Sequence, residues 1–261
     1  MDLQFIPLEQ FQNFLLCLSR VLGLIAAIPV FAGSRMAIRL KIGLGFATAM
    51  LLFPLMAPYT PSISSTTELG VILVNEILLG SLLGLTAQLI FTGINFGGTV
   101  IGYQMGFAAA NIFDPQTTQQ LSLMSQFINV FSILIFLALD IHHLYLHTII
   151  ESYQLLPPGY LNFSDEAIPK LMELAGHMFL LGVKFSAPVL VLLLISNMVL
   201  GILARVFPQL NVFMLSFPMN IGISLLVIGL TLNAALLILR QEFDTLGYTF
   251  LDFFALLAPS H

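Results

Sequence analysis

The sequence is poor in charge. Only 8% of its 261 residues are Asp, Glu, Lys or Arg, whereas an average soluble domain has about 25%. Hydrophobic residues make up 58% of the chain, and its mean hydropathy is +1.00. So few charges cannot cover a water-facing surface. The composition therefore excludes an ordinary soluble globular protein and predicts an integral membrane protein surrounded by lipid.

Other absences narrow the function. The net charge of −5 is not a polybasic pattern, so no nucleic-acid partner is expected. The single cysteine, Cys17, cannot form an internal disulfide and is predicted to be a packing residue. The sequence shows no paired nucleophile and base, phosphate-cradling loop or nucleotide motif. We therefore expect no catalytic residues, no cofactor and no enzymatic activity.

Six long apolar runs dominate the chain. Each approaches or exceeds the roughly 20 residues that cross a bilayer as a helix, and none alternates polar and apolar residues as a barrel strand would. Pro188 and Pro218 lie inside the last two runs and predict kinks there. The prediction is an all-α polytopic membrane protein, one domain over 1–261, with about six long kinked helices in hairpins and an outer polar loop at 141–175. The runs cover 11–31, 38–57, 69–92, 121–140, 176–204 and 209–239.

Glycine is concentrated in the stretch 93–120, and its spacing is regular. Glycines four residues apart place bare backbone on one face of a helix and let another helix approach closely. An apolar patch follows, and then Asp114-Pro115, where a helix is expected to stop and another to begin. We expect this stretch to pack against neighbouring subunits of an assembly. The close-packing candidates are Gly93, Gly97, Gly98, Gly102 and Gly106.

Charges inside the apolar runs are informative, because each costs about 2.5–3.5 kcal/mol at a membrane centre. Three occur, Arg20, Glu76 and Lys184, and Arg205 between the last two runs is grouped with them as a buried assembly charge. We favour pairing between helices or contact with a partner subunit over an ion or proton path. Glu76 and Lys184 have opposite signs and are one candidate pair.

A polar cluster follows the fourth run. Asp140, His142 and His143, with His147 one turn later, have the spacing of metal ligands. A polar ring or cap at a helix end explains the same residues. Because no second cluster of Cys, His or acid completes a site, we expect no bound metal.

Four motifs, in order along nearly the whole chain, resemble those of the FliR family of type III export-apparatus proteins. No single motif is specific, but together they are. They are Arg20-Val-Leu-Gly with Ile28-Pro29-Val30-Phe31; Gly102-Tyr-Gln104-Met-Gly106-Phe-Ala with Asp114-Pro115; Asp140-Ile-His142-His143 with Ser152; and Ala187-Pro188, Asn197, Arg205 and Pro208-Gln209-Leu-Asn211-Val-Phe213.

The resemblance implies a chain built like a FliP and a FliQ joined together, within a helical FliP–FliQ–FliR assembly. That assembly would lie at the bacterial inner membrane, in the flagellar basal body, on FlhA and FlhB homologues, and would pass unfolded flagellar proteins. The resemblance also implies that the loop after the glycine-rich helix plugs the pore. The plug residues would be Gly106, Phe107, Ala108, Ala109, Ala110, Asn111, Ile112, Phe113, Asp114 and Pro115.

Two alternatives remain open. The virulence-type homologues share much of the pattern, although Gln104-Met-Gly106-Phe and Pro208-Gln-Leu-Asn-Val-Phe resemble the flagellar members more closely. A small-solute secondary transporter or channel would also use broken helices and intramembrane charges. Related halves are typical of transporters, and the sequence shows none.

Overall fold

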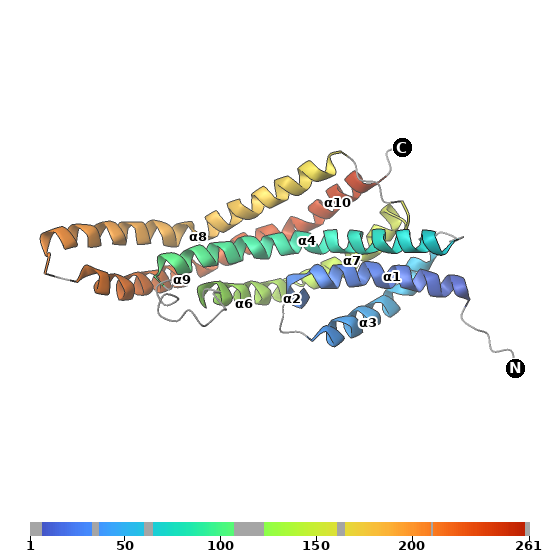
Figure 1. Ribbon diagram of the computed structural model, residues 1–261, viewed down its shortest axis with the longest axis horizontal. Coiled ribbons are helices and arrows are strands. Elements are labelled where there is room, and N and C mark those ends of the chain that lie inside the picture. The colour runs from blue at the N-terminus through green and yellow to red at the C-terminus, as the bar shows by residue number, and fades with distance from the viewer. Residues whose placement is uncertain are drawn as a thin grey trace. The chain divides into compact units, whose positions relative to one another are not determined.

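The computed structural model describes residues 7–32, 37–59, 65–106, 123–160, 165–209 and 211–258. Every regular element in these ranges is a helix, which confirms the all-α prediction (Figure 1). The elements are α1 (Leu8–Ala27), α2 (Pro29–Ala32), α3 (Ile38–Met56), the 3₁₀ helix η1 (Ala57–Tyr59), α4 (Thr66–Gln104), α6 (Leu123–Ala138), α7 (Ile141–Leu155), α8 (Ala167–Val206), α9 (Val212–Asp244) and α10 (Leu246–Leu257).

Within the described residues, five helices or helix pairs are long and apolar enough to cross a membrane, and the bent pair α6–α7 gives a sixth when it is counted as one span. The expected number of about six is confirmed, although several boundaries differ. The apolar run 69–92 and the glycines that follow it as far as Gly102 lie in one 39-residue helix, α4. Pro188 is accommodated inside the 40-residue α8, which bends partway along its length in Figure 1.

The predicted polar loop at 141–175 is wrong, because α7 and the first turns of α8 lie within it. Tyr145, Thr148 and Ser152 of α7 are buried, whereas His147 and Glu151 are exposed. Buried residues three or four apart mark an amphipathic helix that packs one face on protein. Hydropathy alone misses such a helix, because its polar face lowers the average.

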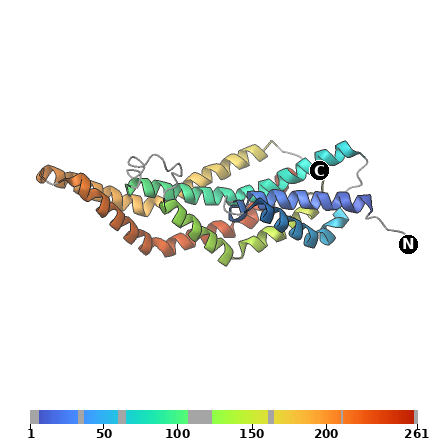
Figure 2. The same cartoon turned by 60° about the horizontal axis from the view of Figure 1, so that its bottom comes forward.

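The chain divides into two compact units. The first comprises residues 1–89, 140–174 and 244–261, and the second comprises 90–139 and 175–243. Within the first unit α1 lies along α3, as Figures 1 and 2 both show. The Cys17 thiol is 3.3 Å from the sulfur of Met56 and 3.5 Å from the carbonyl oxygen of Ala49. Cys17 is therefore a buried packing residue of the α1–α3 contact.

Glycine also brings α1 against the first half of α4. A Cβ atom added to Gly80 would collide with the carbonyl of Arg20 and lie 2.9 Å from the amide nitrogen of Leu24. A Cβ atom added to Gly23 would lie 2.6 Å from the carbonyl oxygen of Ile77. The two backbones therefore touch with no side chain between them, and each contact needs a glycine.

The second unit has an aromatic centre. Phe91 of α4, Phe136 of α6 and Phe243 of α9 form three ring contacts with centroids 5.6–5.9 Å apart. Further along, α9 runs back beside α8, and Asn220 bonds across to Ser196 at 3.2 Å and Asn197 at 3.1 Å. Such polar contacts hold the register of two otherwise apolar helices.

The α1–α4 contact yields a direct test. Gly80→Ala should lower the melting temperature of the detergent-solubilised protein by several degrees, because its new methyl group meets backbone atoms that cannot move aside. Gly70→Ala in the same helix is the matched control, because its methyl group would meet nothing within 4 Å. That control should be neutral or stabilise the helix by up to about 1 kcal/mol. Equal melting temperatures for the two variants would contradict the close contact.

Candidate functional site

The clearest candidate site is a buried ion pair in the first unit. Arg20 lies in α1 and donates from Nε and Nη2 to the two carboxylate oxygens of Glu76 in α4, at 2.5 and 3.0 Å. Neither residue has any solvent exposure. A two-point contact between guanidinium and carboxylate is both strong and geometrically specific.

Helix α7 completes the surroundings of the guanidinium. Nη1 of Arg20 donates to the hydroxyl of Ser152 at 2.8 Å, and Nη2 donates to the carbonyl of Leu156 at 3.1 Å. The guanidinium carbon lies 3.8 Å from the centre of the Tyr153 ring, a cation–π distance. We call Arg20, Glu76, Ser152, Tyr153 and Leu156 the arginine cluster; it joins α1, α4 and α7.

The local sequence explains why this pair forms. Glu76, Gly80 and Gly84 are four residues apart, so all three lie on the face of α4 that meets α1. The glycines let the two backbones touch, which places the carboxylate beside Arg20. The cluster is closed to solvent and its charges are matched. It therefore serves to hold three helices together and offers no accessible path for an ion.

The structure corrects the expected partners of the charged residues. Of the partners left open for Glu76, the structure selects Arg20 and not Lys184. Lys184 and Arg205 are exposed rather than buried. The four charges thus divide into one satisfied internal pair and two cations at the surface of the second unit.

The glycine stretch packs within the chain. Added Cβ atoms on Gly93 and Gly97 would lie 2.6 and 2.7 Å from carbonyl oxygens of Met178 and Gly182 in α8. An added Cβ atom on Gly98 would lie 3.0 Å from the Cα atom of Ser125 in α6. The helices that approach Gly93, Gly97 and Gly98 closely therefore belong to the same chain, whereas neighbouring subunits were the expected partners.

Gly102 is buried, and Gly106 ends the stretch in a conformation that favours glycine. The φ angle of Gly106 is +90°, and an added Cβ atom would lie 2.6 Å from the ring of Phe217 in α9. Both backbone and space therefore exclude a side chain here. The remaining plug candidates, 107–115, lie outside the described residues.

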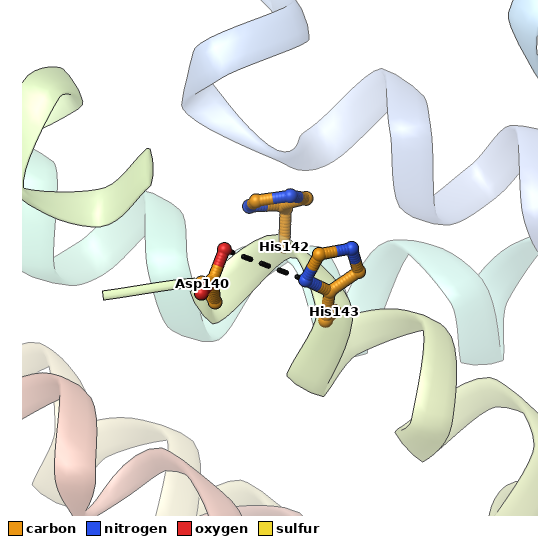
Figure 3. A group of neighbouring side chains, drawn as sticks. All are labelled: Asp140, His142 and His143. Carbon is orange, nitrogen blue, oxygen red and sulfur yellow. Dashed lines mark ion pairs between the residues drawn. The ribbon is translucent and has the colours of Figure 1, made fainter. Parts of the chain in front are cut away.

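Asp140, His142 and His143 lie together at the start of α7 (Figure 3). The Asp140 carboxylate is 3.5 Å from Nδ1 of His143, and both side chains are largely exposed, 72% and 66%. Atoms of the three residues that could bind a metal lie within 4.8 Å of one another. Asp140 has a φ angle of 55° and separates α6 from α7. The exposed pair matches the polar helix end expected from the sequence, and the absence of a metal stays a prediction.

Sequence reasoning missed most of the partners of Arg20. Ser152 was noted only as part of a sequence motif, and no role was predicted for Tyr153 or Leu156. It also missed the hydrogen bond between the buried hydroxyls of Thr86 and Tyr145, 3.0 Å apart. The spacing of polar residues along α7 could have indicated these contacts. Tyr145, Thr148 and Ser152 are three or four residues apart and therefore lie on one face.

The arginine cluster yields a prediction about stability. Arg20→Met and Glu76→Leu should each destabilise the protein by about 3–5 kcal/mol, because each leaves a buried charge without its partner. Combining Arg20→Met with Glu76→Leu should recover most of that loss, because an apolar pair of similar size needs no compensation. Lys170→Met is the control, since the ion pairs of Lys170 with Glu173 and Asp252 involve exposed carboxylates and contribute at most about 1 kcal/mol.

Chemical or thermal unfolding in detergent measures all four variants. If the double variant loses as much unfolding free energy as the two single variants together, an apolar pair cannot replace the ion pair, and the prediction is wrong.

Comparison with known proteins agrees with this architecture. Residues 11–246 match the sequence family described as bacterial export proteins, family 1. The chain is 35% identical over 213 residues to flagellar biosynthetic protein FliR of Pectobacterium carotovorum subsp. carotovorum, covering 82% of this chain and 81% of the relative. It is 31% identical to FliR of Bacillus subtilis (strain 168), covering 97% and 98%. It is 30% identical to FliR of Escherichia coli (strain K12), covering 92% of this chain and 89% of the relative. The chain belongs to the FliR family of bacterial export proteins.

Proposed function

We propose that this chain is a non-enzymatic subunit of the flagellar type III export gate. It assembles with FliP and FliQ homologues, on FlhA and FlhB homologues, into a pore that passes unfolded flagellar proteins across the bacterial inner membrane at the basal body. The whole chain acts as one gate domain, built like a FliP and a FliQ joined together. The flagellar names of the relatives favour this system over the virulence-type one.

The observation that carries the proposal is the length of the apolar helices. With 40 residues, α8 is about 60 Å long, twice the roughly 30 Å hydrocarbon core of a bilayer. Even at a tilt of about 40°, the upper end of the usual range, it would span about 46 Å. Large apolar side chains are exposed at both of its ends, Ile168 at 67% and Val206 at 60%. Lipid cannot cover both ends, which supports a position of this helix among other subunits.

Helices α4 and α9 are also longer than the hydrocarbon core of a bilayer. They have 39 and 33 residues, which corresponds to about 58 and 50 Å. Exposed apolar residues are spread along them, including Val71 and Phe96 in α4 and Met214 and Leu237 in α9. Apolar surface that extends beyond the bilayer is typical of a subunit buried in a larger assembly.

The internal chemistry supports a structural role for the chain. The buried charges Arg20 and Glu76 bind each other and are sealed from solvent. Hydroxyls in the apolar helices bond to backbone carbonyls one turn earlier, as Ser132 does to Ile128 and Thr231 to Val227. The donors of these hydroxyls are therefore used within their own helices.

We further propose that residues 106–115 close the pore. Small and apolar side chains seal a passage by excluding water without binding a transiting chain tightly. Gly106 lies two residues beyond the end of α4, and its φ angle of +90° is of the kind that terminates a helix. Only Gly106 of this set lies within the described residues.

Co-purification tests the assembly. When the chain is expressed with its FliP and FliQ homologues and extracted in mild detergent, affinity capture of the chain should recover both partners in one species of constant composition. Isolation of a stable monomer that takes up a small solute in proteoliposomes would instead identify a secondary transporter. Cryo-electron microscopy of the captured species would show whether the three proteins share a pore.

The plug is tested separately in assembled complexes. Replacing Phe107 and Phe113 with Gly should raise ion leak through the membrane while secretion partly survives, because the seal loses its bulk but the passage remains. Replacing Phe179, an exposed ring on α8 that lies outside the loop, with Gly is the control and should leave the leak unchanged. Unchanged leak in the double variant would overturn the assignment of 106–115 as the plug.

A further inference from the structure

The second unit contains an apolar groove with one charged residue. The groove is open to the surface and is bounded by α4, α6, α8 and α9. Its walls are mostly aromatic and aliphatic side chains. Two lining residues of α9, Ala234 and Ala235, have small side chains. Among the described residues that line the groove, Lys184 alone is charged. Phe127, Phe131, Pro188, Ile228 and Leu232 are among the apolar lining residues.

Lys184 has no ion pair within the part of the chain that the structure describes. This sets it apart from Arg20, which is buried against Glu76, and from Lys170 near the start of α8, which binds Glu173 and Asp252. Lys184 lies near the middle of the apolar helix α8. An ammonium group there is costly unless an anion accompanies it.

The second unit itself offers no described carboxylate for Lys184. Between 90–139 and 175–243 its acidic residues are Asp114, outside the described residues, and Glu242. Glu242 bonds to Nε2 of His177 at 2.7 Å. The hydroxyl of Thr231, also in the groove, donates to the carbonyl of Val227 at 2.8 Å. Lys184 is therefore the polar group in the groove that is left to recognise a partner.

We infer that this groove binds an apolar helix of another subunit of the export gate, and that an Asp or Glu on that helix pairs with Lys184. The inference rests on the proposed function. Apolar walls match an apolar helix, the two alanines allow close approach, and the single cation requires a single carboxylate. Because water is excluded from such a contact, the charge pair selects this partner and fixes its register.

Variants of Lys184 test the inference in the co-expressed complex. Lys184→Met and Lys184→Glu should each reduce the recovered partner at least about tenfold, because each leaves a carboxylate facing an apolar groove. The matched control exchanges Val183 and Lys184, which keeps composition and charge but moves the cation off the groove. Val183 is exposed and does not line the groove. The exchange should fail like Lys184→Met, and full recovery with it would overturn the inference.

A photo-crosslinker identifies the occupant. Placed at Phe127, which lines the groove, it should capture a partner segment that is apolar and contains an Asp or Glu. Placed at Phe179, which is exposed to nearly the same degree (53% against 54%) but does not line the groove, it should not capture that segment. Lys184→Glu combined with a Lys at the captured acid should restore assembly. Capture of lipid only, of a second copy of this chain, or of the chain's own segment around Asp114 would overturn the inference.

Failure of the proposed function and failure of the groove assignment give different results. If the unaltered chain recovers no FliP or FliQ homologue, the proposed function fails. If the unaltered chain recovers both and every Lys184 variant recovers them equally, only the groove assignment fails.

Discussion

The guanidinium of Arg20 has no access to water, so the protein must satisfy its donors and balance its charge. Four hydrogen bonds, to Glu76, Ser152 and Leu156, and the ring of Tyr153 do this. A cluster of this kind works only if α1, α4 and α7 stand at one spacing and one register, because a displacement of one turn would leave a charge unpaired. The glycines at the α1–α4 contact make that spacing possible. The arrangement of the first unit therefore depends on this cluster and on the bare backbone beside it.

The second unit uses glycine in the same way but handles charge differently. Gly93 and Gly97 bring α4 against α8, yet Lys184 of α8 is exposed and lacks a described carboxylate. One unit thus satisfies its intramembrane charge internally, whereas the other presents a cation beside an apolar groove. Helices of about 50–60 Å with apolar side chains exposed at both ends add to this contrast. Together these features describe a chain whose own packing is incomplete and whose remaining surface is suited to other subunits.

Part of this architecture could be predicted from the sequence, and the reasons for success and failure are physical. Long apolar runs identify membrane helices because lipid requires every backbone group to be bonded within the segment. The partner of Glu76 could not be predicted, because two cations were available and linear spacing does not say which helix lies beside α4. Glycine spacing correctly marks close approach but cannot name the partner, so an internal contact with α8 was taken for a contact between subunits. Helix α7 was missed because its apolar face is buried on protein and its other face is polar.

A buried ion pair is not needed for stability alone, since a well-packed apolar pair of similar volume is often as stable or more so. Its value in a chain of apolar helices is specificity. Leucine- and isoleucine-rich faces fit together in many registers, and lipid gives no penalty for the wrong one. The contacts that distinguish registers here are polar: Arg20 with Glu76, Thr86 with Tyr145, and Asn220 with Ser196 and Asn197. Such fixed points hold the helices of each unit in one arrangement, and that arrangement sets the shape of the apolar faces that each unit exposes.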